Sequence, residues 1–511
     1  MPRKQSPLFE AYAIPRFMRI LATLGCALLG FLVTWGAIAL ILKRWRPRPT
    51  SADQGAFHHT HQVPVPRFGG VALVAAFLAL ATIALVWLPV DDPDKRRVQW
   101  AIVLTVLGMF LLGLWDDIRP LGARKKLLGQ IMIATAACYS GIGVDYLQNP
   151  LDNSLYNLAA WGWIFSIFWL VALTNVVNLI DGIDGLAGGI ALMLMCLLTY
   201  GGFVRDHAFL VLCTGGMCGA LLAFLKYNFP PARIYLGDGG AYFLGSLIGA
   251  LTLVHSEKGT VVAALIAPLF ALALPITDVG LAVLRRGLRG LPIFRADRRH
   301  IHHRLLALGL SRTRAVLILY GISLVFLLLA FAVFWSQGRL VPILLGCACL
   351  ILLFSARSFS FSRGWFGVGR VLGNCLEVRK ETQCALALGR WLEMEAERAD
   401  SIAGLWSDFQ FLARKLGFAR VALSLQDEER VWAAPDAQAG EPVFHTVQEL
   451  NGGAMMRVEF TMRQDKMSSQ SFGHLAEILA ECWFKAALRW QRCNRLPVRF
   501  DARLEVGRPG L

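Results

Sequence analysis

Long apolar runs, each long enough to cross a lipid bilayer, recur through the first 355 residues of the chain. A membrane-spanning helix needs roughly 20 apolar residues, because each residue adds about 1.5 Å and the hydrocarbon core is about 30 Å thick. The pattern therefore predicts an α-helical polytopic membrane protein with about 11 transmembrane helices. The predicted spans cover residues 18–42, 70–89, 98–115, 127–144, 159–179, 185–204, 207–225, 241–256, 260–282, 315–335 and 340–355.

Beyond residue 355 the pattern becomes that of a soluble domain. The basic and aromatic sequence SARSFSFSRGWFGVGR predicts a juxtamembrane linker over residues 356–375, between a membrane domain at 1–355 and a soluble domain at 376–500. In the soluble domain, amphipathic helices flank two alternating segments, ARVALSLQ and MMRVEFTMR, which are typical of strands. We therefore expect a C-terminal soluble α/β domain, faintly similar to GAF-like folds, that acts as a docking appendage or as a ligand sensor.

Composition and charge agree with membrane insertion and indicate an orientation. Hydrophobic residues make up 56% of the chain and charged residues 17%, with a mean hydropathy of +0.52. The net charge of +16 comes mainly from basic residues in alternate loops, which the positive-inside rule places in the cytoplasm. We expect a multi-pass protein of the inner (cell) membrane, with its N-terminus outside and its C-terminal domain cytoplasmic. Attraction to membrane lipids accounts for the basic loops, so no nucleic-acid partner is predicted.

The sequence LTNVVNLIDGIDGLAGG at residues 173–189 places polar residues inside an apolar run. Asn175, Asn178, Asp181 and Asp184 recur every three residues. On a helix this spacing puts the first three on one face. Ionisable groups in a membrane segment are costly and usually functional, and a position at the cytoplasmic end of a span lets water reach them. The two asparagines also have a simpler interpretation, as hydrogen-bonding residues between helices.

Four further polar loops fall on the same predicted side of the membrane. Their carboxylates, together with the asparagines and without a zinc-type cysteine pattern, indicate a hard cation such as Mg²⁺. Their lysines, arginines and glycine-rich turns suit anionic phosphate oxygens. The mixture predicts phosphoryl-type transfer between a cytoplasmic nucleotide and a membrane lipid. The residues concerned are His61, Arg67, Asp116, Asp117, Lys125, Asp238, His300, His302, His303 and Arg304.

Five motifs occur in order along the membrane domain: HQVPVPRFGG, WDDIRP, NVVNLIDGIDGLAGG, YNFPPARIYLGDGG and ADRRHIHHRLLALGL. Together they resemble the polyprenyl-phosphate N-acetylhexosaminyl-1-phosphate transferases, over roughly residues 15–355. The resemblance implies transfer of GlcNAc 1-phosphate, or a related HexNAc 1-phosphate, from a UDP-sugar to undecaprenyl phosphate, with release of UMP. This reaction would be the initiating step of a cell-envelope glycan. The resemblance also implies Mg²⁺ as cofactor, with Mn²⁺ as an alternative ion.

The resemblance further implies a role for each matching residue. Asn178 and Asp238 correspond to the metal ligands. Asp116 and Asp117 correspond to paired acids that act as base or contact the lipid phosphate. Together with these two, Asp181 and Asp238 complete the catalytic set. Substrate contacts are implied for Lys125, Asn175, Asp184, His61, His300, His302, His303 and Arg304.

Alternatives remain open for the substrate and for the class of protein. The branch that uses UDP-MurNAc-pentapeptide tends to have three consecutive histidines, whereas HIHHR favours the UDP-GlcNAc branch. The sequence ADQGAFHHTH departs from the basic residues that the family often has there. A non-catalytic membrane scaffold is a rival class; a transporter is disfavoured, because the polar residues lie at one surface and no repeat is found. A homodimer and a covalent aspartyl intermediate also remain open.

Overall fold

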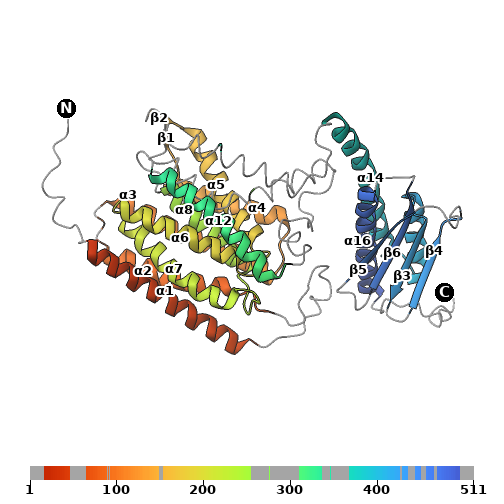
Figure 1. The fold of residues 1–511 in the computed structure, drawn as a ribbon, viewed down its shortest axis with the longest axis horizontal. Helices are drawn as coiled ribbons and strands as arrows, with labels where there is room; N and C mark the ends of the chain where they lie inside the picture. The colour runs from red at the N-terminus through yellow and green to blue at the C-terminus, as the bar shows by residue number, and fades with distance from the viewer. Residues whose placement is uncertain are drawn as a thin grey trace. The chain divides into compact units, whose positions relative to one another are not determined.

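The computed structural model of the chain describes residues 16–45, 65–88, 90, 92–148, 154–254, 276, 310–335, 346, 368–425, 428–435, 443–450, 456–464 and 469–494. The chain divides into two compact units (Figure 1). The first is formed mainly by residues up to 361 and the second mainly by residues from 362 onward.

The first unit consists of long apolar helices. Eight helices of the described residues have the length and composition to cross a membrane, which confirms the predicted polytopic helical fold. A shorter helix, α4 (Ala123–Tyr139), lies where a span was predicted at 127–144. The spans predicted at 260–282 and 340–355 lie outside the described residues, apart from single positions. The eight are α1 (Arg16–Arg44), α2 (Gly69–Trp87), α3 (Pro93–Ile118), α5 (Ala160–Ile180), α6 (Leu186–Val204), α7 (Ala208–Asn228), α8 (Gly237–Val254) and α12 (Arg312–Trp335).

Helix α1 exposes a stripe of large apolar side chains. Leu21, Leu24, Leu28 and Leu32 recur at helical spacing, and all four are exposed. With its other face α1 packs on α2 and α7, where a Cβ on Gly219 would lie 1.8 Å from the carbonyl oxygen of Ala27 (Figure 1). The helix therefore presents one apolar face to lipid and uses small residues to approach its neighbours closely.

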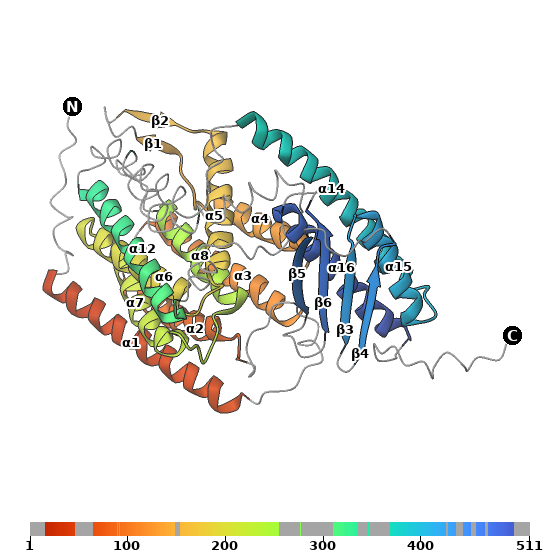
Figure 2. The same ribbon diagram turned by 45° about the vertical axis from the view of Figure 1, so that its right-hand side comes forward.

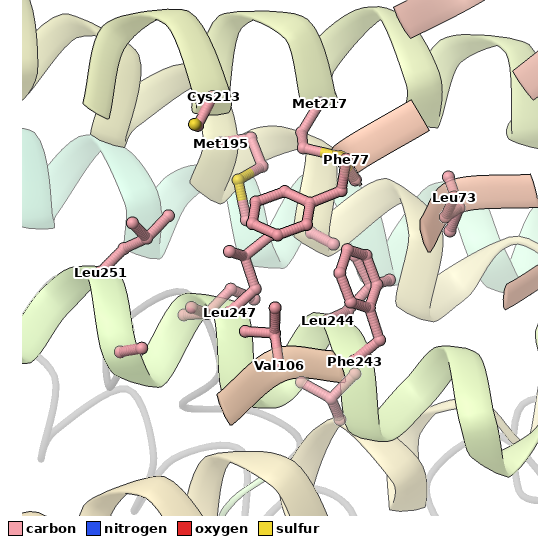
Figure 3. Packing of buried hydrophobic residues seen from close by; sticks show 14 of the residues in the cluster. Leu73, Phe77, Val106, Met195, Cys213, Met217, Phe243, Leu244, Leu247 and Leu251 are labelled. Carbon is pink, nitrogen blue, oxygen red and sulfur yellow. The ribbon is translucent and has the colours of Figure 1, made fainter. Parts of the chain in front are cut away.

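Helix α8 forms the centre of the first unit. Every residue from 239 to 253 is buried. The rings of Phe77 in α2 and Phe243 in α8 meet edge to face with centroids 5.5 Å apart. Figure 3 shows side chains of α3, α6 and α7, including Val106 and Met195, that complete this core. Lipid tails are as apolar as these side chains, so the hydrophobic effect does not drive helices together within a membrane. Close packing of this kind stabilises their association instead.

Glycines bring α3 and α5 against the backbone of α8. A Cβ on Gly113 would lie 2.5 Å from the carbonyl oxygen of Asp238, and one on Gly245 would lie 2.6 Å from that of Leu173. Trp169 of α5 donates a hydrogen bond to Thr252 near the opposite end of α8. Helix α5 therefore runs antiparallel to α8, and the C-terminal ends of α3 and α5 both meet the N-terminus of α8.

A short hairpin stands between α4 and α5. Strands β1 (Tyr146–Gln148) and β2 (Leu155–Asn157) pair antiparallel, with Leu147 opposite Tyr156. Because the hairpin precedes the first turn of α5, it lies at the end of that helix away from the N-terminus of α8.

The second unit combines helices with an antiparallel sheet of four strands in the order β4-β3-β6-β5 (Figure 2). The predicted mixture of helices and strands after residue 375 is confirmed, but the sequence pattern missed β4 and β5. Both are rich in polar residues, so that hydrophobic alternation is weak. The elements are α14 (Val368–Glu395), α15 (Ile402–Lys415), β3 (Arg420–Leu425), β4 (Glu428–Ala433), β5 (Val443–Leu450), β6 (Met456–Arg463) and α16 (Ser469–Asn494).

Aromatic residues fill the core of the second unit. Trp483 of α16 is fully buried and packs against Trp406 and Phe409 of α15. Phe460 of β6 meets Phe418 at 5.2 Å between ring centroids. Helix α15 begins at a capping residue, because the hydroxyl of Ser401 accepts a hydrogen bond from the backbone N–H of Gly404. The unit thus has its own hydrophobic core.

Candidate active site

Two carboxylates and one ammonium group meet where α3, α4 and α8 come together. Lys126, in the first turn of α4, forms ion pairs with Asp116 at the end of α3 and with Asp238 at the start of α8. The distance from Lys126 Nζ to Asp238 Oδ2 is 3.3 Å. The side chain of Asp116 is 6% exposed, that of Lys126 26% and that of Asp238 31%. The other oxygen of Asp116 accepts a 2.6 Å hydrogen bond from the backbone N–H of Leu121, which fixes the turn between α3 and α4.

Asp117 holds the N-terminus of α8. Its two carboxylate oxygens accept hydrogen bonds from the backbone N–H groups of Asp238, at 3.0 Å, and Gly239, at 2.9 Å. A carboxylate at a helix N-terminus satisfies free N–H groups and interacts favourably with the helix dipole. Gly237 makes the approach possible, since its φ is +77° and a Cβ there would lie 2.4 Å from the carbonyl oxygen of Arg67.

The polar end of α5 points toward the same place. The antiparallel contact between α5 and α8 puts Asn178 and the following Asp181 opposite the first turn of α8. The carboxyl group of Asp181 interacts electrostatically with those of Asp238, Asp117 and Asp184. Loss of water contact on burial, followed by repulsion from these carboxylates, raises the pKa of Asp181 well above its usual range. The structure thus gathers carboxyl groups around the N-terminus of α8.

Two arginines lie near these carboxyl groups. Arg67, in the segment before α2, interacts electrostatically with Asp117 and Asp181. Tyr235, just before α8, interacts with Arg67 and with Arg312, the first residue of α12. The backbone fixes this arrangement, because Tyr235 N–H donates to the carbonyl of Pro66 at 2.8 Å. The early loop and the loop before α8 are therefore joined next to the carboxylates.

Asp184 and Asn228 secure the loop that follows α7. Oδ2 of Asp184 accepts a 3.2 Å hydrogen bond from the backbone N–H of Ala232. The buried side chain of Asn228 accepts from Gly185 N–H at 2.9 Å and donates to the carbonyl of Ile234 at 2.8 Å. Sequence reasoning missed Asn228, although an asparagine at the end of an apolar run was a visible signal.

Comparison with known proteins identifies the family. The sequence pattern of glycosyl transferase family 4 matches residues 99–256, which include all the carboxylates above. A probable undecaprenyl-phosphate N-acetylglucosaminyl 1-phosphate transferase of Bacillus subtilis (strain 168) is 30% identical over 334 residues, which are 65% of this chain and 90% of that protein. The chain belongs to glycosyl transferase family 4.

Two other relatives show how the named substrates vary within the matches. A phospho-N-acetylmuramoyl-pentapeptide-transferase of Desulforudis audaxviator is 31% identical over 338 residues, which are 61% of this chain and 97% of that protein. A decaprenyl-phosphate N-acetylglucosaminephosphotransferase of Mycobacterium tuberculosis is 29% identical over 315 residues, which are 56% of this chain and 76% of that protein. The resemblance inferred from the five motifs is confirmed at the level of the family.

In this family 4 site, Lys125 and Asn175 are two predicted substrate contacts that lie within the described residues. Lys125 is exposed, and its neighbour Lys126 is the residue that lies between Asp116 and Asp238. The side-chain nitrogen of Asn175 donates 2.7 Å hydrogen bonds to Gln130 and to the carbonyl of Val171. Substrate contact by Lys125 and by Asn175 stays a prediction.

Five of the predicted substrate contacts fall outside the described residues. This applies to His61 and to the late motif with His300, His302, His303 and Arg304. Their assignments to substrate therefore stay predictions. The described part of the site consists of carboxylates, one lysine, two arginines and the asparagine side chains at the ends of α5 and α7.

Proposed function

We propose that this family 4 transferase moves GlcNAc 1-phosphate, or a related HexNAc 1-phosphate, from a UDP-sugar to undecaprenyl phosphate, with release of UMP. The product would be the first lipid-linked intermediate of a cell-envelope glycan. The observation that carries the proposal is the meeting of Asp116, Lys126 and Asp238 at the ends of three helices. The names of the Bacillus and Mycobacterium relatives both support the sugar and a polyprenyl phosphate as acceptor, and the Bacillus name supports undecaprenyl phosphate.

The donor set fits a hard divalent cation. Asp116, Asp117, Asp181 and Asp238 concentrate carboxyl oxygens, and Asn178 stands on the facing helix α5, from which it would supply an amide oxygen. Among the described residues, no three His, Cys, Asp or Glu side chains already form a metal-binding group. Mg²⁺ typically takes one or two protein carboxylates and completes its shell with water and substrate phosphates.

In the proposed reaction Asn178 and Asp238 would hold the cation, which would supply positive charge to neutralise the diphosphate. An oxygen of the lipid phosphate attacks the phosphorus that bears the sugar, and the bond from that phosphorus to the UMP oxygen breaks. A phosphate monoester has a second pKa near 6, so the nucleophile is largely dianionic at neutral pH. Asp116, fixed by Lys126 and by Leu121 N–H, therefore positions the nucleophile and does not need to remove a proton.

The site would face the cytoplasm. The basic loops that flank the described carboxylates include Arg119, Arg124, Lys125 and Lys226, and the positive-inside rule assigns these loops to the cytoplasmic side. A UDP-sugar is a cytoplasmic metabolite, so this orientation supplies the donor substrate directly.

UDP-MurNAc-pentapeptide is the alternative donor, because the Desulforudis relative is named for that sugar. The HIHHR sequence favours the GlcNAc branch, but these residues lie outside the described part of the chain. The two donors differ by a lactyl ether on the sugar and the pentapeptide attached to it, so a direct comparison of both separates the alternatives.

The test is UMP release by the purified full-length chain in detergent, with undecaprenyl phosphate and a panel of UDP-sugars. We expect release with UDP-GlcNAc, little with UDP-MurNAc-pentapeptide, and loss of release when a chelator removes divalent ions. Return of activity with Mg²⁺ or Mn²⁺ would support the metal site. A folded protein that turns over no UDP-sugar would contradict the proposal and favour a non-catalytic scaffold.

A further inference from the structure

A polar cluster lies one helical turn from the ion pairs of Lys126. Gln130 in α4 is completely buried, and its side-chain oxygen accepts a 2.7 Å hydrogen bond from Asn175 of α5. The hydroxyl of Tyr242 in α8, which is 1% exposed, lies close enough to the Gln130 side chain to interact with it. One amide side chain thus joins three helices. Burying an amide side chain costs free energy unless the amide is hydrogen-bonded, so its partners stabilise Gln130 in this position.

Each member of the cluster is close in sequence to a residue of the site. Gln130 is four residues after Lys126, and Tyr242 is four residues after Asp238. Residues four apart lie on the same face of a helix, one turn along it. Asn175 stands three residues before Asn178. The cluster is therefore a second polar layer, one turn deeper along α4, α5 and α8.

The position of Lys126 depends on helix α4. A lysine side chain is long and flexible, and holding it between two carboxylates costs conformational entropy. Its ammonium can stay there only if the rotation and height of α4 are fixed against α3 and α8. Helix α4 has only 17 residues, and exposed Leu128 and Met132 form part of its surface. The interactions of Gln130 with α5 and α8 add to the packing of α4 on α3 and restrain its rotation.

We propose that Gln130 is a positioning residue, which through Asn175 and Tyr242 fixes α4 so that Lys126 is held between Asp116 and Asp238. The importance of this for turnover rests on the proposed function. The placement of Lys126 does not depend on the proposed function. Hydrogen bonds that only join helices would stabilise the protein without affecting Lys126 in particular.

The first measurement is the acetylation of lysines by a small amine-reactive reagent, followed by mass spectrometry of the full-length chain. Lys125 is exposed and adjacent, so it serves as an internal reference for Lys126. In Gln130→Leu we expect the Lys126 to Lys125 labelling ratio to rise several-fold. Tyr242→Phe, which keeps the amide pair, should raise it less and remains informative if Gln130→Leu does not accumulate.

The matched control is Trp169→Phe. It removes a 3.0 Å hydrogen bond from Trp169 to Thr252, between the same helices α5 and α8 but at their other end. We expect this variant to lower thermal stability without changing the labelling ratio. An unchanged ratio in both Gln130→Leu and Tyr242→Phe, or an equal rise in the control, would overturn the proposal.

The second measurement is a double-mutant cycle on UMP release. Gln130→Leu should lower kcat about tenfold, the size expected for loss of a buried hydrogen bond, and leave KM for the UDP-sugar within about twofold. In a Lys126→Met background the same change should add little, because Gln130 acts through Lys126. Additive losses would overturn the proposal. A wild-type chain without turnover would contradict the proposed function, while the labelling experiment would still decide the role of Gln130.

Discussion

Adjacent residues at the end of α3 have different tasks. Asp116 points its oxygens at Lys126 and at Leu121 N–H, whereas both oxygens of Asp117 accept backbone N–H groups of α8. Successive helix positions differ by about 100°, so neighbouring side chains reach different partners. The two paired acids therefore have separate tasks in the structure: Asp116 lies beside the lysine, and Asp117 anchors a helix.

The carboxylates should also differ in their effect on turnover. Asp238→Asn removes the predicted metal ligand and should lower kcat by about 100-fold or more. Asp116→Asn should have a smaller effect, because a dianionic lipid phosphate needs no strong base. UMP release at matched expression compares the two variants. If only Asp116→Asn is inactive, the prediction that Asp238 matters more for turnover than Asp116 is wrong.

Gly237 is a second residue whose replacement has a defined consequence. Gly237→Ala puts a Cβ at positive φ and into contact with the carbonyl of Arg67, so it should destabilise the fold by about 1–3 kcal/mol. Thermal unfolding of the full-length protein in detergent measures the effect. Gly122→Ala is the control, because a Cβ there has nothing within 4 Å. Equal melting temperatures in the two variants would contradict the prediction.

At the scale of elements, apolar run length predicted the membrane helices well, because a span must satisfy its backbone internally and remain apolar over bilayer length. The spacing of Asn178 and Asp181 also indicated correctly that polar groups gather at one end of α5. The choice between Lys125 and Lys126 could not be made, since two adjacent lysines are equivalent until the rotation of α4 is known. Gln130 gave no signal, because its importance comes from partners on two other helices.

The contact between α14 and α15 predicts a pH dependence in the second unit. Partial burial, and then the nearby Glu395, raise the pKa of Asp408. The folded state therefore binds this proton more tightly than the unfolded state. The resulting stabilisation is complete below the unfolded pKa of about 4 and is lost as pH rises through the higher folded pKa.

Asp408→Asn should remove this dependence and make α15 more stable at neutral pH. Hydrogen exchange of peptides from α15, measured in the full-length chain at pH 4 and pH 7, reports the local stability. The variant should exchange more slowly than the wild type at pH 7 and should show a smaller difference between the two pH values. Identical profiles for both proteins would show that Asp408 is not responsible.

For the whole molecule, the distribution of charge and the exposed cysteines give a test of orientation. Cys384 and Cys493 are exposed in the second unit, which we predict to be cytoplasmic. A membrane-impermeant maleimide should label them only after cells are permeabilised. Tyr156→Cys, in the hairpin predicted to lie outside, should be labelled in intact cells. Labelling of Cys384 or Cys493 in intact cells would reverse the predicted topology.

The direct backbone contact of α3 with α8 affects how the protein responds to bilayer thickness. Gly113 and Asp117 leave no space between the two helices at the level of Asp238, so a change in tilt must move both together. Helix α8 is only about 27 Å long from its 18 residues, shorter than a bilayer core of about 30 Å, so it is subject to hydrophobic mismatch. Thicker or thinner membranes would therefore tilt α3 and α8 together and preserve the separation of Asp116 and Asp238.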